Sequence, residues 1–198
     1  MRNQASRAIF DYWINIKGDH AAPLRTEIDP TALRHLLPHL FIIANDTQGV
    51  LAFRLAGTRI CDLFNREFRS APFATVWTDG DQHRPAEIAR HVILYEKPAL
   101  LDVLASNGDT QHPYEMLLMP VRSTEVDACD RVLGALLPCE ERFSATHRPL
   151  VGLALEDWTF LTGAASHFGV PVTGDRRSIP DALRRLLPGR QSSSGRAS

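Results

Sequence analysis

The chain has 198 residues, a length that suits one domain with some appended segments. Hydrophobic residues make up 44% of the sequence, which is enough to build a packed core. The charges are balanced, with 22 Lys and Arg against 23 Asp and Glu and a formal net charge of −1. This balance argues against a dedicated nucleic-acid-binding protein, because such proteins carry a basic excess.

The cysteine count and the apolar pattern indicate in which cellular compartment the protein is expected. The three cysteines, Cys61, Cys129 and Cys139, are widely spaced and form neither a disulfide framework nor a paired metal motif. No apolar run approaches the roughly 20 residues that a membrane-spanning helix requires, and no signal peptide is visible. We therefore expect a cytoplasmic protein with no metal site and no membrane insertion.

The first predicted element is a helix over residues 6–17, which Gly18 is well placed to end. Four apolar or aromatic residues recur at spacings of three and four and so share one face: Ile9, Tyr12, Trp13 and Ile16. Such a face either packs on the chain's own sheet or forms an interface with another molecule. We expect these four residues to contribute to a homodimer contact.

A second helix is predicted after Asp29-Pro30, with Asp29 as its N-cap and Pro38 as its end. Residues 40–44 and 51–56 then form two apolar runs on either side of a polar turn. These two runs predict an antiparallel hairpin.

The next segment, up to about residue 95, is predicted to be helical. Gly57 breaks the strand pattern, and apolar residues at helical spacing follow it through residue 64. A longer helix is expected from Asp79 or Asp81 to about Tyr95.

Three further strands are predicted over residues 100–105, 113–122 and 132–137. Asn107-Gly108 predicts a hairpin turn between the first two of them. Residues 150–155 could add another strand or lie extended along the core. Beyond Thr162 the apolar pattern thins, although residues 178–187 could form a short helix within an Arg-rich tail.

The chain is thus divided into a helical region over residues 1–38, a core over 39–158, and a flexible extension over 159–198. The order of elements in the core resembles that of a PAS domain. Several motifs are similar to those of a stand-alone PAS-type sensor family common in alphaproteobacteria, and the resemblance covers about residues 6–158. These motifs are Tyr12-Trp13, Ile28-Asp29-Pro30, Leu36-Leu37-Pro38, Phe53-Arg54-Leu55-Ala56-Gly57-Thr58, Glu115-Met116-Leu117-Leu118-Met119-Pro120 and Leu133-Gly134-Ala135-Leu136.

One position departs from the family pattern. Asn65 stands where the family often has glycine after a Leu-Phe pair. Asparagine tolerates the left-handed backbone conformation better than most residues, so we expect the turn to persist.

The resemblance implies an α+β fold, with a five-stranded antiparallel sheet, helices packed on one of its faces, and an additional N-terminal helix. PAS domains bind a small molecule between the sheet and the helices, or bind nothing and act through protein contacts. From the length of the chain we expect no attached output domain. The resemblance therefore implies a non-enzymatic sensor that acts through dimerisation or through a separate signalling partner.

The expected pocket consists of residues that would face the gap between the sheet and the helices. They are Phe53, Leu55, Arg59, Ile60, Phe64, Trp77, Ile88, Val92 and Leu117. All but Arg59 would also suit a filled core, so the sequence leaves a ligand pocket and a ligand-free interaction module as alternatives. Arg59 could hold a carboxylate or phosphate group, or form a surface ion pair.

Cofactor chemistry was considered at two positions. Cys61 lies near the reactive cysteine of flavin-photosensing PAS domains but lacks their neighbouring Arg and Gln, and His91 lies on the helix where heme-binding PAS proteins place an axial ligand. We expect no cofactor at either residue. Neither a nucleophile elbow nor a glycine-rich phosphate loop occurs in the sequence, so no catalytic residue is predicted.

Overall fold

The structure is a computed structural model that describes residues 1–78, 80, 82–123, 128–139 and 148–162. These residues belong to one compact unit, Met1–Ala165, and a second unit, Ser166–Ser198, lies outside them. The helix predicted over residues 178–187 and the Arg-rich tail therefore also lie outside the described residues.

An antiparallel sheet forms the centre of the described unit. Its strands follow the order β2-β1-β5-β4-β3-β6, and every neighbouring pair is antiparallel. The strands are β1 (Leu40–Asn45), β2 (Leu51–Ala56), β3 (Ala99–Ser106), β4 (Gln111–Arg122), β5 (Cys129–Pro138) and β6 (Gly152–Phe160). The α+β class is confirmed, but the expected number of five strands is wrong, because β6 pairs with β3 as an additional outer strand.

The turn between β3 and β4 is built by the side chain of Asn107. Its Oδ1 accepts hydrogen bonds from the backbone N–H groups of Asp109 (3.1 Å) and Thr110 (2.9 Å). Gly108 takes a φ of 94°, a conformation that glycine adopts without strain. The turn predicted from Asn107-Gly108 is confirmed.

One face of the sheet is covered by α2 (Thr58–Phe64), the 3-10 helix η3 (Phe73–Val76) and α3 (His83–Tyr95). Helices and sheet together enclose a continuous apolar cluster, which we call the helix-side core. Its aromatic centre is a group of rings in mutual contact: Phe41, Phe53, Phe64, Phe68, Phe73 and Trp77.

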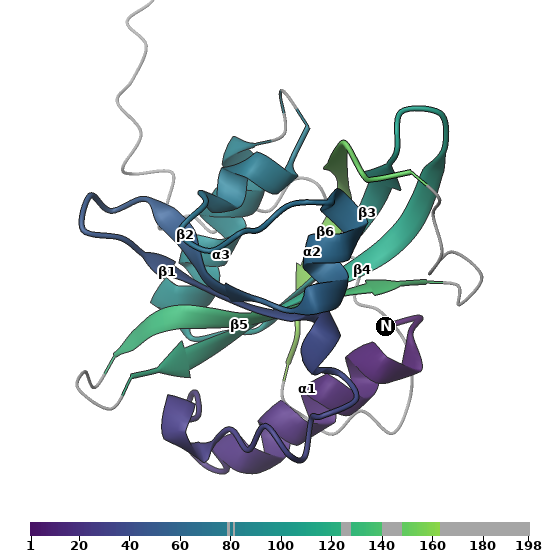
Figure 1. Cartoon of the computed structure of the whole chain (residues 1–198). Helices are drawn as coiled ribbons and strands as arrows, with labels where there is room; N and C mark the ends of the chain where they lie inside the picture. Colours follow the sequence, from purple (N-terminus) through teal and green to yellow (C-terminus); the bar gives the residue numbers. More distant parts are fainter. Residues whose placement is uncertain (79, 81, 124–127, 140–147, 163–198) are drawn as a thin grey trace, which may run out of the picture. The chain divides into compact units, whose positions relative to one another are not determined.

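The opposite face of the sheet is covered by α1 (Gln4–Lys17), as Figure 1 shows. Ile9 and Trp13 are 0% and 1% exposed and pack on strands β4 and β5, and the Trp13 indole N–H donates to the carbonyl of Pro120 at 3.0 Å. These two residues belong to a second apolar cluster, the α1-side core, and are not available for the dimer contact that we expected of them. Tyr12 and Ile16 are half-buried.

The helix expected after Asp29-Pro30 is wrong. Residues 30–36 form turns, the Asp29 carboxylate accepts from the N–H of Thr31 at 2.8 Å, and the segment ends in a short 3-10 helix, η2 (Leu37–His39). The backbone bonds of this segment are mostly of the tighter i to i−3 type, from the Arg34 N–H to the Thr31 carbonyl (3.3 Å) and from the Leu36 N–H to the Leu33 carbonyl (2.7 Å), so the segment forms successive turns.

The short helix α2 has a close contact at its start and a left-handed residue at its end. Asn65 takes φ 49° and ψ 43°, as expected from its tolerance of that conformation. At the N-cap, a Cβ on Gly57 would lie 2.3 Å from the carbonyl oxygen of Leu37 and 2.4 Å from that of Pro38. Only glycine fits there without moving the backbone that connects η2 to β1.

We predict that Gly57→Ala destabilises the domain by about 1–3 kcal/mol, because the added methyl group overpacks against two backbone carbonyls. Urea denaturation followed by circular dichroism measures the change. The neighbouring Thr58→Ala variant is the control, since Thr58 is exposed and its loss is expected to cost no more than about 0.5 kcal/mol. Equal midpoints for the two variants would contradict the prediction.

Candidate functional site

The helix-side core holds a small internal void between β1, β2, α2 and the central strands. Its volume is about 10 Å³, and eight apolar side chains line it: Phe41, Phe53, Ile60, Phe64, Val76, Met116, Leu136 and Leu153. Such a volume suits no more than about one water molecule, whereas pockets for drug-sized molecules measure roughly 300–1,000 Å³.

Most of the predicted pocket residues gather around this void. Phe53, Ile60 and Phe64 line it directly. Trp77, Ile88 and Val92 are 0–3% exposed and belong to the same cluster. Six of the nine predicted pocket residues therefore lie in the helix-side core, whose side chains fill most of the space.

Three predicted pocket residues lie elsewhere: Leu55, Arg59 and Leu117. Leu55 is 50% exposed, because a bulge in β2 pairs Ile42 with Leu55 but Ile43 with Phe53 and so interrupts the inward alternation. Leu117 is fully buried but belongs to the α1-side core. Its neighbours Met116 and Leu118 point into the helix-side core, since successive residues of a strand face opposite sides.

Trp77 carries a polar atom that the described residues leave without a hydrogen-bond partner. The residue is 3% exposed, its ring meets that of Phe73 edge to face at 5.8 Å, and its indole N–H finds no acceptor in the described part of the chain. A buried donor without an acceptor costs about 1–3 kcal/mol, and such groups are uncommon in folded proteins. Trp77 therefore brings an unpartnered donor into the helix-side core.

A second polar group lies near the start of α2. The Nδ1 atom of His39 is buried and has no partner among the described atoms. Burial lowers the pKa of His39, a hydrogen bond with the Leu136 backbone opposes this shift, and the Arg59 guanidinium lowers the pKa further. Burial raises the pKa of Tyr114, and Arg59 acts against that shift. Arg59, itself half-buried, therefore lies close enough to influence both groups.

The structure gives the surroundings of Cys61 and His91, the two residues considered for cofactor chemistry. The Cys61 thiol lies 3.8 Å from the Glu67 carboxylate, and burial together with that carboxylate raises its pKa, which disfavours a reactive thiolate. The His91 ring packs on Tyr95 with 5.4 Å between ring centroids and does not line the void. Burial also raises the pKa of a second thiol, Cys129, to about 12.

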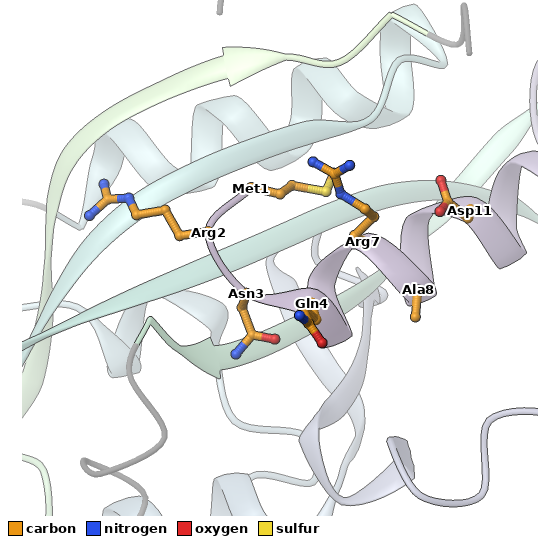
Figure 2. Close-up of a pocket in the computed structure, with 7 residues that line it drawn as sticks. All are labelled: Met1, Arg2, Asn3, Gln4, Arg7, Ala8 and Asp11. Carbon is orange, nitrogen blue, oxygen red and sulfur yellow. The ribbon is translucent and has the colours of Figure 1, made fainter. Parts of the chain in front are cut away.

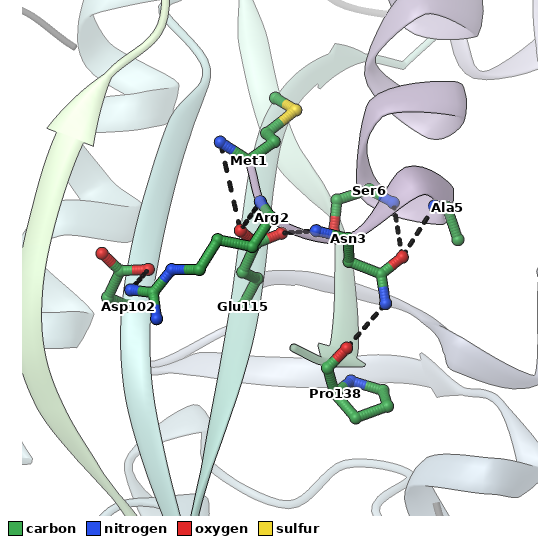
Figure 3. A network of polar contacts seen from close by, with 8 residues as sticks. All are labelled: Met1, Arg2, Asn3, Ala5, Ser6, Asp102, Glu115 and Pro138. Atoms are coloured by element: carbon green, nitrogen blue, oxygen red, sulfur yellow. Dashed lines mark hydrogen bonds and ion pairs between the residues drawn. The ribbon is translucent and has the colours of Figure 1, made fainter. Parts of the chain in front are cut away.

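The N-terminal segment forms a polar network on the other side of the sheet, shown in Figure 3. Glu115 is 1% exposed and accepts hydrogen bonds from the backbone N–H groups of Arg2 and Asn3, the latter at 3.2 Å. The Asn3 side chain caps α1 through Ala5 and donates to the Pro138 carbonyl at 2.6 Å. The Arg2 guanidinium forms an ion pair with Asp102 at 3.0 Å.

A groove of about 500 Å³ lies beside this network (Figure 2). The described residues that line it are Met1, Arg2, Asn3, Gln4, Arg7, Ala8 and Asp11. It is therefore separate from the predicted pocket, with which it shares no lining residue.

The family model for the PAS domain matches residues 1–137. The chain belongs to the PAS domain family. The match includes α1 and strands β1 to β5 up to residue 137, so β6 lies beyond it. The narrower assignment to a stand-alone alphaproteobacterial group stays a prediction.

Among solved structures, this PAS domain is similar to the light-state structure of the blue-light photoreceptor Aureochrome1 LOV, with 12% identity and a TM-score of 0.42 over 58% of this chain and 91% of that one. A comparison with curated proteins found no match. Within the described residues, no helix of this PAS domain is long and apolar enough to cross a membrane.

The sequence did not identify the residues of the N-terminal network. One signal was present, since Glu115 is the single charged residue within the apolar run 114–121. A charge in such a run is rarely fully buried unless it is paired. Its partners could not be deduced, because they are backbone groups more than 110 residues away.

We predict that His39 makes the stability of this PAS domain depend on pH. Its pKa is lower in the folded state than the roughly 6.5 of an unfolded chain, so the unfolded chain binds the proton more readily. The stabilisation is present above pH 6.5 and is lost as the pH falls from there through the folded-state pKa. His39→Gln should therefore reduce the drop in melting temperature between pH 7.5 and pH 5.5.

Thermal unfolding of wild type and variant at both pH values measures this difference. The matched control is His20→Gln, since His20 is exposed. If the melting temperature falls by the same amount in His39→Gln and in wild type, His39 is not the source of the pH dependence.

Proposed function

We propose that this chain is a non-enzymatic sensory and signalling module in which the helix-side core is the sensing element. Family membership supports the general role, and the unpartnered indole N–H of Trp77 supports this particular site. The donor lies at the end of η3, whose Val76 lines the void, and its backbone forms a bridge with Leu153, another lining residue. A ligand acceptor near this position would satisfy the donor.

The lining defines the chemistry of such a ligand. Eight apolar side chains surround the void, five of them aliphatic or thioether and three aromatic, so the ligand would be a small apolar molecule with one acceptor oxygen. Because the void is about 10 Å³, binding requires the rings to repack. Phe64, at 8% exposure, is the most exposed of the lining side chains. A ligand that binds only the expanded state would shift the population toward it.

The small void also supports a second candidate. A core with only about 10 Å³ of free volume is close to the packing density of ordinary protein interiors. In this alternative the core is filled and binds nothing, and the module acts through contacts with a partner protein.

Thermal unfolding with pairs of small apolar probes separates the two candidates. Toluene and benzaldehyde differ chiefly in one acceptor oxygen, so a site that uses Trp77 favours benzaldehyde. At a concentration 100 times its Kd, a ligand stabilises the folded state by about 2.7 kcal/mol, which corresponds to roughly 5–10 °C in a domain of this size. We predict a shift in this range for the carbonyl-bearing members of such pairs.

Trp77→Phe is the matched variant, since it keeps an aromatic ring and removes the donor. It should respond equally to both members of each pair. If no probe stabilises the wild-type protein, and mass spectrometry of the purified protein finds no co-purified molecule, the filled-core candidate is favoured.

We further propose that the module forms a homodimer through the outward side of α1. Of the four residues predicted for this contact, Ile16 is half-buried and lies outside the α1-side core, whereas Tyr12 packs against that core and its hydroxyl accepts from the Asp29 N–H at 2.7 Å. Deletion of the whole helix would uncover the sheet, because Ile9 and Trp13 are part of the core. Point variants are therefore the better test. Light scattering should give twice the chain mass of 22.1 kDa for wild type and the single mass for Ile16→Glu.

The control for the dimer is Leu94→Glu. Leu94 is 70% exposed on α3, on the other side of the sheet, so this variant should remain dimeric. A wild-type mass of 22.1 kDa would contradict the proposal.

A further inference from the structure

Three carboxylates lie in line across the outer half of the sheet. In the register of β3 and β4, Asp102 lies opposite Glu115, and in the register of β3 and β6, Asp102 lies opposite Asp157. Residues directly opposite each other in antiparallel strands have Cβ atoms about 4.5–5.5 Å apart and point to the same face. We call these three residues the acidic row.

The acidic row lies on the face that α1 covers. Glu115 precedes Leu117 by two positions on β4, and Leu117 belongs to the α1-side core. Like charges directly opposite each other destabilise a sheet. The row therefore weakens the attachment of the outer strand β6 unless a positive group compensates it.

Residues 1–3 supply this compensation (Figure 3). The Arg2 guanidinium bonds Asp102, the central member of the row, at 3.0 Å. The backbone N–H groups of Arg2 and Asn3 donate to Glu115. Asn3 also caps α1 and bonds Pro138, so the segment that neutralises the row is joined rigidly to the helix.

We propose that residues 1–3 act as an electrostatic latch that couples the docking of α1 to the attachment of β6. When the latch is closed, the Arg2 guanidinium reduces the repulsion between the Asp102 and Asp157 carboxylates, and β6 stays paired with β3. When the segment leaves, Glu115 gains water in place of its backbone donors, and the repulsion between Asp102 and Asp157 loosens β6. The coupling is reciprocal, since any energetic linkage between two sites must be. This inference goes beyond the proposed function and requires no ligand in the helix-side core.

Amide hydrogen exchange of the full chain tests the latch, because it reports the opening of each element separately. Arg2→Gln removes the guanidinium and should speed the exchange of residues 152–160 by about two- to fivefold, the range expected for a like-charge pair across two strands. Arg7→Gln is the matched control, since it removes the same charge from an exposed position nearby in the sequence, on α1. It should leave β6 unchanged.

A second variant tests whether repulsion between Asp102 and Asp157 is what loosens β6. Asp157→Asn removes the outer charge of the row but keeps the Oδ1 atom that accepts from the Trp158 N–H at 2.8 Å. In the Arg2→Gln background it should return the exchange of β6 to the wild-type rate, a non-additive result that independent sites would not give. The effect of Arg2→Gln should also shrink in 0.5 M NaCl, because Arg2 and Asp102 are partly exposed and salt screens their interaction.

Three outcomes would overturn the proposal. The first is that Arg2→Gln speeds the amide exchange of α1 but not that of β6. The second is an equal effect of Arg2→Gln and Arg7→Gln on β6. The third is that Asp157→Asn, in the Arg2→Gln background, fails to return the exchange of β6 to the wild-type rate. Both substituted positions are exposed at least in part, so the comparison does not depend on a variant that disrupts the core.

Discussion

The structure depends on the burial of the central strands from both sides. Residues 114–119 of β4 are each no more than 2% exposed, and the apolar residues of β5 from Val132 onward are no more than 4% exposed. Alternate side chains of these strands enter two different cores, so neither face can be left uncovered. Burial of this apolar surface stabilises the fold at about 25 cal/mol per Å², which makes α1 as necessary to the domain as α2 and α3 are.

This two-sided burial explains which parts of the sequence could be interpreted correctly. Alternation and turn residues predicted the two hairpins, the helices α1, α2 and α3 and the left-handed Asn65, because these features are local. Leu117 was assigned to the wrong core, since a strand that is apolar on both faces gives no alternation to distinguish them. Leu55 was misplaced by a bulge, which depends on the pairing with β1 and leaves no clear trace in β2 itself.

The two candidate sites also differ in how far the sequence could predict them. The helix-side core could be predicted because its members are apolar and close in the order of elements. The partners of Glu115 could not, because they are backbone groups that only the folded chain brings to it. The proposed sensing site and the latch lie on opposite faces of one sheet. Strand β4 contributes to both, with Met116 in the sensing site and Glu115 in the latch.

The positions of the tryptophans have a practical consequence for this arrangement. Trp13 lies in one apolar layer and Trp77 in the other, and both are at most 3% exposed. Each layer thus contains its own intrinsic fluorophore, whose emission depends on the polarity around the indole ring. The third tryptophan, Trp158, packs against the helix-side core, so versions of the chain that lack Trp158 and keep only one of the other two would allow the faces of the sheet to be observed independently in solution, without an added label.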